Sequence, residues 1–115
     1  MDIEEVRDYC LTKRMATECF PFDEDTLVFK VAGKIFACLS LRRPDLLILK
    51  CEPDYAIELR DRYWAIEPAF HFNKRHWNQH LLPHLDDALV RSLIDHSYAE
   101  VVRNLPRKLR AAFAE

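Results

Sequence analysis

Hydrophobic and polar residues alternate most clearly on both sides of Gly33, the only glycine in the chain. Leu27–Val31 precedes this residue and Lys34–Leu39 follows it, each with the period of two that is typical of a half-buried strand. A two-residue hairpin turn requires positive φ, which glycine adopts without strain. We therefore predict a β-hairpin in which Phe29 opposes Phe36. The side chains expected on its core face are those of Leu27, Phe29, Val31, Phe36 and Cys38.

Three other stretches have the spacing of amphipathic helices, with apolar residues three or four positions apart. The first is predicted from about Ile3 to Lys13, and it begins with the D-x-x-E pattern of a capping box. The second begins at Pro53, because proline is favoured in the first turn of a helix. The third has Asp86 or Asp87 as its N-cap. Its apolar stripe consists of Leu89, Leu93, Ile94, Ser97, Val101 and Leu105.

Extended segments fill the intervals between these helices. Thr17–Phe22 is short and rich in β-branched and aromatic residues, Leu46–Cys51 is predicted as a strand, and Trp64–Phe70 is extended but interrupted by Pro68. Consecutive strands joined by tight turns pair in the antiparallel sense, and the helices then cover one face. We predict one α+β domain, residues 1–115. It contains an antiparallel sheet built on the hairpin, with flanking N-terminal, middle and C-terminal helices.

Composition narrows the classes of function. The chain has 115 residues, half of them hydrophobic, which is enough for one core. Its net charge of -2 excludes a protein that coats nucleic acid through bulk charge, so nucleic-acid binding would require a local basic patch. No apolar run approaches the roughly 18 residues of a membrane span, and the start of the chain is acidic, unlike a signal peptide. We expect a cytoplasmic protein with no membrane partner.

Neither the cysteines nor the histidines predict a metal site. No two cysteines form a C-x-x-C pair, so we expect reduced, buried thiols. His76, His80 and His84 are spaced by four, but Pro83 interrupts any helix that would align them. We therefore expect no metal and no cofactor. The cysteines are Cys10, Cys19, Cys38 and Cys51.

The motifs of common enzyme classes are absent from the sequence. There is no G-x-S-x-G elbow, and a single glycine cannot form a glycine-rich phosphate loop. We expect a non-enzymatic protein. One enzymatic alternative stays open, in which His71 or His76 acts as a general acid or base, since histidine exchanges a proton near neutral pH.

The densest polar stretch is His71–Asn78, which holds two histidines, two asparagines, two basic residues and two aromatics. Pro68 disfavours a helix that runs straight into it. Lys74 and Arg75 offer charge to phosphate, and Trp77 offers a stacking face to a base. A tryptophan in a small domain is more often part of the core, so we expect Trp77 there. In an alternative interpretation, the stretch forms the rim of a protein- or small-ligand-binding pocket.

These features resemble the MmcQ/YjbR-like family of small bacterial proteins. The block His71-Phe72-Asn73-Lys74-Arg75-His76-Trp77-Asn78 is the most specific match, and the resemblance extends over nearly the whole chain. It implies a CyaY-like α+β fold. One departure is Asp23, which stands where the family usually has glycine; aspartate tolerates positive φ if the position needs it. The weaker matches are Phe20-Pro21-Phe22, Phe29-Lys30-Val31 with Gly33-Lys34, Leu49-Lys50-Cys51, Ser97-Tyr98 and Val101-Val102.

The resemblance also implies DNA binding through a double-wing arrangement of hairpins. We expect double-stranded DNA as the partner and a monomeric protein. The residues expected to contact nucleic acid are Lys34, Arg42, Arg43, Lys74 and Arg75. The residues of the motif are His71, Asn73, Lys74, His76, Trp77 and Asn78.

Overall fold

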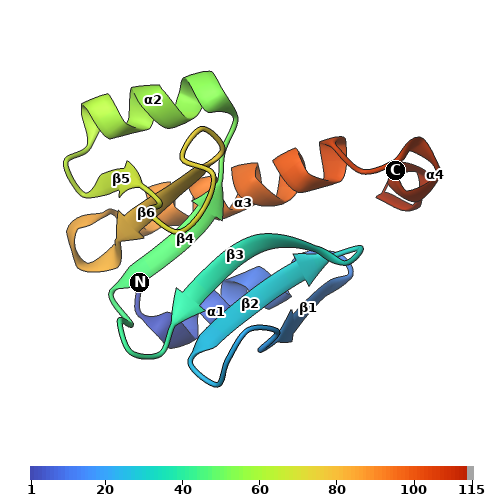
Figure 1. The fold of residues 1–115 in the computed structure, drawn as a ribbon, viewed down its shortest axis with the longest axis horizontal. Helices are drawn as coiled ribbons and strands as arrows, with labels where there is room; N and C mark the ends of the chain where they lie inside the picture. Colours follow the sequence, from blue (N-terminus) through green and yellow to red (C-terminus); the bar gives the residue numbers. More distant parts are fainter. Residues whose placement is uncertain (114–115) are drawn as a thin grey trace.

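The computed structural model describes residues 1–113 as a six-stranded antiparallel sheet with its three longer helices on one face (Figure 1). The strand order is β1-β2-β3-β4-β6-β5, so only the last two strands depart from chain order. The predicted α+β class is confirmed. The strands are β1 (Ala16–Cys19), β2 (Thr26–Val31), β3 (Lys34–Ser40), β4 (Leu46–Lys50), β5 (Ile66–Pro68) and β6 (Trp77–Leu81). The helices are α1 (Ile3–Leu11), α2 (Pro53–Arg62), α3 (Asp87–Arg103) and α4 (Arg107–Arg110), with 3-10 turns at Leu82–His84 and Ala111–Phe113.

Local capping signals set where the first two helices begin. The Asp2 carboxylate accepts a hydrogen bond from the backbone N–H of Glu5, and the Glu5 carboxylate accepts one from the N–H of Asp2, as the sequence predicts. Pro53 begins α2 as predicted, and the Glu52 carboxylate caps that helix by accepting from two backbone N–H groups. Helix α1 ends at Leu11, two residues before its predicted end. Within residues 1–113, no helix is both long and apolar enough to span a bilayer.

The β2–β3 hairpin forms where the alternation predicts it, but its register differs from the prediction. Both turn residues have positive φ, 50° at Ala32 and 77° at Gly33. A bulge then makes Phe36 an extra residue in β3, so Phe29 opposes Ala37 instead of Phe36. Beyond the bulge the alternation shifts by one position. Cys38 therefore lies outside the core cluster formed with the helices, and its predicted place is taken by Ala37 and Leu39.

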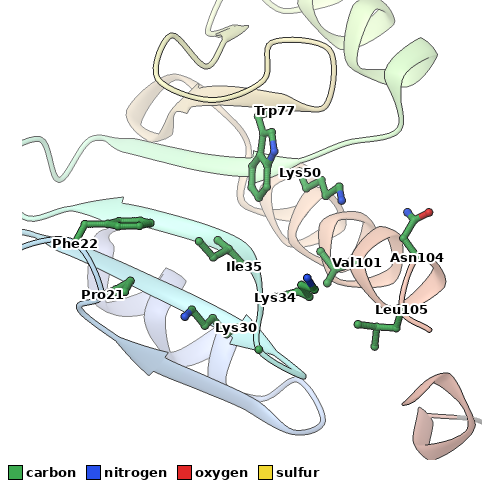
Figure 2. A pocket seen from close by; sticks show the side chains of 11 residues that line it. Pro21, Phe22, Lys30, Lys34, Ile35, Lys50, Trp77, Val101, Asn104 and Leu105 are labelled. Carbon is green, nitrogen blue, oxygen red and sulfur yellow. The ribbon is translucent and has the colours of Figure 1, made fainter. Parts of the chain in front are cut away.

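Strands β3 and β4 pair over only three residues each and then diverge, as Figures 1 and 2 show. Beyond the last pair, Ala37 with Leu49, a side chain from α3 takes over the hydrogen bonding. The Ser97 hydroxyl oxygen accepts a hydrogen bond from the backbone N–H of Lys50 at 2.9 Å and donates one to the carbonyl oxygen of Phe36 at 2.5 Å. Ser97 is fully buried, so its hydroxyl bridges the two diverging strands in place of a backbone ladder.

Replacing Ser97 by alanine will destabilise the fold. The change leaves one donor and one acceptor of the backbone buried without partners, at a cost of about 1–3 kcal/mol each. Urea denaturation should show the free energy of unfolding falling by about 2–4 kcal/mol. The matched control is Ser92→Ala at an exposed position of the same helix, which should stay within about 0.5 kcal/mol of the wild type. Equal losses in the two variants would refute the bridging role.

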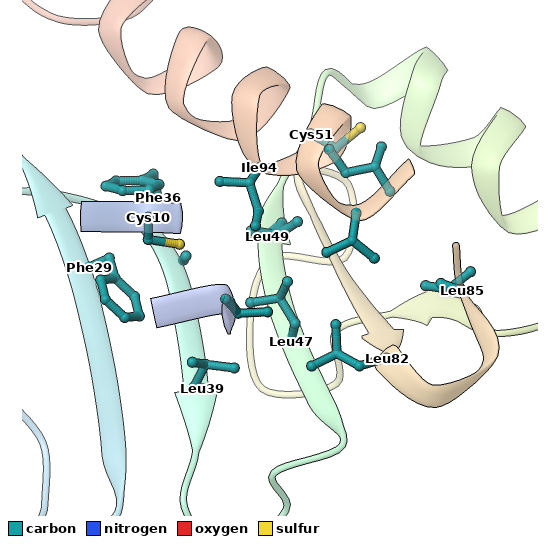
Figure 3. Close-up of a cluster of buried hydrophobic side chains, with 14 of the residues drawn as sticks. Cys10, Phe29, Phe36, Leu39, Leu47, Leu49, Cys51, Leu82, Leu85 and Ile94 are labelled. Atoms are coloured by element: carbon teal, nitrogen blue, oxygen red, sulfur yellow. The ribbon is translucent and has the colours of Figure 1, made fainter. Parts of the chain in front are cut away.

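The core lies between the sheet and the helices (Figure 3). Cys10 of α1 lies beside Phe29 and Phe36, and Ile94 of α3 lies beside Leu49 (Figure 3). Helix α3 packs against both β3 and β4. The largest fully buried side chains include Phe29, Phe36, Leu39, Leu47 and Leu49, and each side chain of this size contributes about 1.5–3 kcal/mol through burial. One face of the sheet is therefore covered by helices, and the other is left for the loops and the solvent.

His80 is a polar member of this buried layer. It is fully buried in β6, and its Nδ1 lies 2.9 Å from the carbonyl oxygen of Leu47, which accepts a hydrogen bond from it. Burial disfavours the charged ring and lowers the pKa of His80 to about 4. The neutral imidazole is therefore the form that fits the fold.

The burial of His80 makes stability depend on pH. His80 binds a proton near pH 6.5 in the unfolded chain but only near pH 4 in the folded chain. The contribution of neutral His80 to the free energy of unfolding is therefore fully present above pH 6.5 and is lost as the pH drops toward 4. The loss attributable to His80 at pH 4 is about 3 kcal/mol. Chemical denaturation across this range should show a flatter profile for His80→Gln than for the wild type. His84→Ala, at an exposed position, should keep the wild-type slope. An unchanged slope in His80→Gln would contradict the assignment.

Candidate functional site

The gap between β3 and β4 opens into a cleft of about 520 Å³ (Figure 2). Three lysines line it: Lys30 in β2, Lys34 at the start of β3 and Lys50 at the end of β4. Lys30 and Lys50 point to the open face because their neighbours in each strand, Val31 and Leu49, are in the core. The cleft is thus a direct consequence of the divergence of the two strands.

The charged side chains that line the cleft are all basic. No acidic residue lines it, and none of the three lysines forms an ion pair within the described residues 1–113. Other basic side chains of the protein are paired, for example Arg7 with Glu18. Like charges gathered in a concave surface focus a positive potential and attract an anion. The protein therefore has a local cationic site although its net charge is -2.

Trp77 forms the aromatic wall of the cleft. It is the first residue of β6, it opposes Lys50 in the sheet, and its ring centroid lies 5.0 Å from that of Phe72. The expectation that Trp77 belongs to the core is wrong: it is half-buried and lies outside the core cluster. The reason is strand alternation, which turns Asn78 and His80 toward the helices and leaves Trp77 on the open face.

A second hollow, of about 410 Å³, adjoins the cleft. It shares Lys50 and Trp77 with the cleft, and His76 also lines it. Its other charged residues, Glu100 and Arg103, form an ion pair at 2.7 Å. The charges of this pair cancel, so Lys50, which the hollow shares with the lysine cleft, is its one uncompensated charge among the described lining residues.

An apolar groove of about 650 Å³ lies on the same open face. Phe22, Phe70 and Phe72 contribute its aromatic lining, and Cys38 and Ile48 of the sheet also line it. Arg43, His71 and Gln79 are among its polar residues. Because Phe22 also lines the lysine cleft, the groove and the cleft adjoin.

The five basic residues predicted to contact nucleic acid do not form one patch. Lys34 lines the cleft, while Lys74 and Arg75 are exposed on the loop before β6, where the Lys74 ammonium lies 5.4 Å from the Phe70 ring centre. Arg42 and Arg43 follow the other end of β3 and pair with Asp25 at 2.7 Å and Asp45 at 3.3 Å.

The prediction missed two of the three cleft lysines, Lys30 and Lys50. The alternation of β2 already shows Lys30 pointing away from the core, and the same reading of β4 would have found Lys50. Their meeting with Lys34 depends on the divergence of β3 and β4, which leaves no local pattern in the sequence.

Two asparagines of the motif hold the backbone in place. The Asn73 side-chain oxygen accepts a hydrogen bond from the N–H of Arg75 at 3.0 Å, which stabilises the turn before β6. Asn78 is fully buried, donates to the carbonyl oxygen of Ala56 at 3.2 Å and accepts from Arg60 at 3.0 Å. These contacts tie α2 to the sheet, so this part of the motif is structural.

The histidines do not converge. His76 lines the second hollow, His80 is in the core, and the His84 ring lies 4.7 Å from that of Trp64. His71 is exposed at the apolar groove. Among the residues that the structure describes, no three histidine, cysteine or acidic side chains are grouped to hold a metal ion.

Most of the thiols are buried in the interior of the protein. All four cysteines are free, and three are buried while Cys19 is half-buried. Burial raises the pKa of Cys10, Cys38 and Cys51 to about 12 in each case. These three thiols are therefore protonated and poor nucleophiles at neutral pH.

Asp23, the departure from the family pattern, has a capping role. Its carboxylate accepts hydrogen bonds from the backbone N–H groups of Asp25 and Thr26, both at 2.8 Å, and these bonds lower its pKa. Its φ is not positive; Met15 and Ala32 are the non-glycine residues with positive φ in the described chain. Asp23 stabilises the turn that carries Phe22 rather than replacing a strained glycine.

Comparison with known families agrees with this geometry. A family model described as YjbR matches residues 11–100. The chain belongs to the YjbR family. It is 36% identical over 104 residues to the uncharacterized protein YbdF of Escherichia coli O157:H7, covering 84% of this chain and 85% of that protein. It is 31% identical over 112 residues to the uncharacterized protein YjbR of Escherichia coli K12, covering 96% and 95%.

Solved structures share the fold of this YjbR-family chain. A crystal structure of the Deinococcus radiodurans protein DR2400, described as a DUF419 domain, superposes with a TM-score of 0.89 at 30% identity, over 96% of this chain and 86% of that one. A Pseudomonas syringae protein solved by a structural genomics consortium gives a TM-score of 0.72 at 27% identity, over 84% and 96%. The sheet with its one helical layer is therefore the family architecture.

Proposed function

We propose that this YjbR-family protein binds DNA without catalysing a reaction, and that it does so through the lysine-lined cleft on the open face of its sheet. The observation that carries the proposal is the gathering of Lys30, Lys34 and Lys50 around one concavity in whose lining, among residues 1–113, there is no acidic residue. Unpaired ammonium groups in such a setting suit phosphate oxygens. Lys74 and Arg75 are exposed on the loop that leads into Trp77 of the cleft wall, and we assign them further phosphate contacts outside the cleft.

Charge decides how strongly such a surface binds. With three central lysines and a net charge of -2, only a few phosphates are neutralised at once. Each neutralised phosphate of duplex DNA contributes about -0.9 to the slope of log K against log salt concentration. We therefore expect modest affinity that falls steadily as salt is added. A rigid sheet carrying the charges reduces the entropy lost on binding.

Replacing Lys30, Lys34 and Lys50 together by alanine will weaken DNA binding and flatten its salt dependence. The slope should lose about two to three units, because each lysine accounts for roughly one phosphate contact. Fluorescence anisotropy with labelled DNA at several salt concentrations measures both quantities.

The control is Arg14, Arg62 and Arg91 replaced together by alanine, which changes the net charge equally at exposed positions outside the cleft and the groove. This control should retain the wild-type slope within about one unit. If both triple variants lose the same affinity, net charge and not the cleft governs binding. If the wild type shows no binding at low salt, the DNA-binding proposal fails.

The apolar groove favours a second candidate, a small-ligand module. His71 and Phe72 line a cavity of about 650 Å³, within the range of roughly 300–1,000 Å³ usual for small-molecule sites. An apolar ligand there would raise the melting temperature independently of salt. Loss of that stabilisation in Phe70→Ala would assign the ligand to the groove.

A further inference from the structure

We propose that the DNA taken by this surface is single-stranded, and that its bases stack on the aromatic side chains of the open sheet face. This inference rests on the proposed DNA-binding function and specifies the strand state. The aromatic side chains that carry it are Trp77, Phe72 and Phe22.

These aromatic rings connect the cleft with the groove. Trp77 lines the lysine cleft, and its ring centroid lies 5.0 Å from that of Phe72, which lines the apolar groove. Phe22 lines both cavities and is 64% exposed. Flat apolar surfaces therefore continue from one cavity into the other, and Figure 2 shows Phe22 and Trp77 on opposite sides of the cleft.

Positive charge accompanies the rings. Lys30, Lys34 and Lys50 line the cleft end of this surface. At the groove end Arg43 is paired with Asp45 and Asp23 also lines the groove, so the excess positive charge lies at the cleft. A single strand presents a flat base and an anionic phosphate in every nucleotide, so it matches a surface with stacking faces flanked by cations.

The position of Trp77 argues against a duplex as the ligand of these rings. Trp77 is half-buried in the wall of a cleft, not raised on a ridge. In a duplex the base faces are stacked on one another, and a protein reaches only their edges in the grooves. Duplex phosphates could meet the lysines at the rim, but no base face would be offered to Trp77. An unpaired base can enter the cleft edge-first and stack there.

Tryptophan fluorescence tests this inference directly. The chain has two tryptophans, and Trp64 is 70% exposed beside His84, outside the cleft and the groove. In a Trp64→Phe background, Trp77 is the sole reporter. The probes are a thymidine oligomer of about 12 nucleotides, within the usual site size of a stacking platform, its duplex with the adenosine oligomer, and thymidine monophosphate. We expect quenching by the single strand, with affinity at least about tenfold above that of the duplex.

Variants separate stacking from structure. Trp77→Ala should lose about five- to hundredfold in affinity for the single strand, whereas Trp77→Phe, which keeps a ring, should retain most of it. Phe22→Ala tests an exposed ring whose removal leaves the fold intact, and should lose about fivefold or more. Its matched control is Phe20→Ala, 49% exposed but outside both cavities, which should bind like the wild type.

The outcomes distinguish this inference from the proposed function. Binding of the duplex as tightly as the single strand, with Trp77 emission unchanged, would overturn the single-strand inference and leave the DNA-binding proposal standing. Equal affinity for thymidine monophosphate and for the oligomer would show that the surface binds one nucleotide and not a strand, and so would overturn the inference too. If none of the three probes binds, both the DNA-binding proposal and the single-strand inference fail.

Discussion

A single serine hydroxyl holds together the part of the sheet where the strands diverge. Beyond the Ala37–Leu49 pair, β3 and β4 no longer share a ladder, and their free backbone groups would be buried without partners. Ser97 of α3 satisfies one group on each strand. The divergence can persist only because these groups are satisfied, and the lysine cleft exists only because the strands diverge. The packing of α3 and the shape of the open face are therefore set by the same contact.

Strand alternation divides the motif at the start of β6 between two tasks. Asn78 and His80 face the helices, where the first ties α2 to the sheet and the second is held neutral against the Leu47 carbonyl. Trp77, one residue away, faces the cleft. A one-residue slip of β6 would exchange these roles, exposing the buried polar groups and burying the ring. Correct register is thus a condition both for stability and for the candidate site.

A local excess of positive charge is concentrated in the lysine cleft. Basic residues at its edges, such as Arg42 and Arg43, are matched with carboxylates, which reduces their use to an anionic partner. Three lysines from three different strands meet in the cleft, and no carboxylate of the part of the chain that the structure describes pairs with them. Their proximity to Trp77 and the phenylalanines combines charge with flat apolar surface, the two properties that distinguish a nucleic-acid surface from a general anion site.

The sequence by itself determined the class of fold, because hairpin alternation, the turn at Gly33, the capping box at Asp2 and the start of α2 at Pro53 are all local signals. It also identified Lys34 and the loop carrying Lys74. Only the tertiary structure decided the hairpin register, since the bulge at Phe36 is not marked by the alternation of the strand, and the bulged residue packs against a distant segment, with its ring 5.5 Å from that of Tyr98 in α3. Only the tertiary structure decided the site as well. Lys30, Lys34 and Lys50 meet where β3 and β4 diverge, and hydrogen bonds from Ser97 of α3 connect the two strands there. Contacts between segments so far apart in the sequence leave no periodic pattern along the chain.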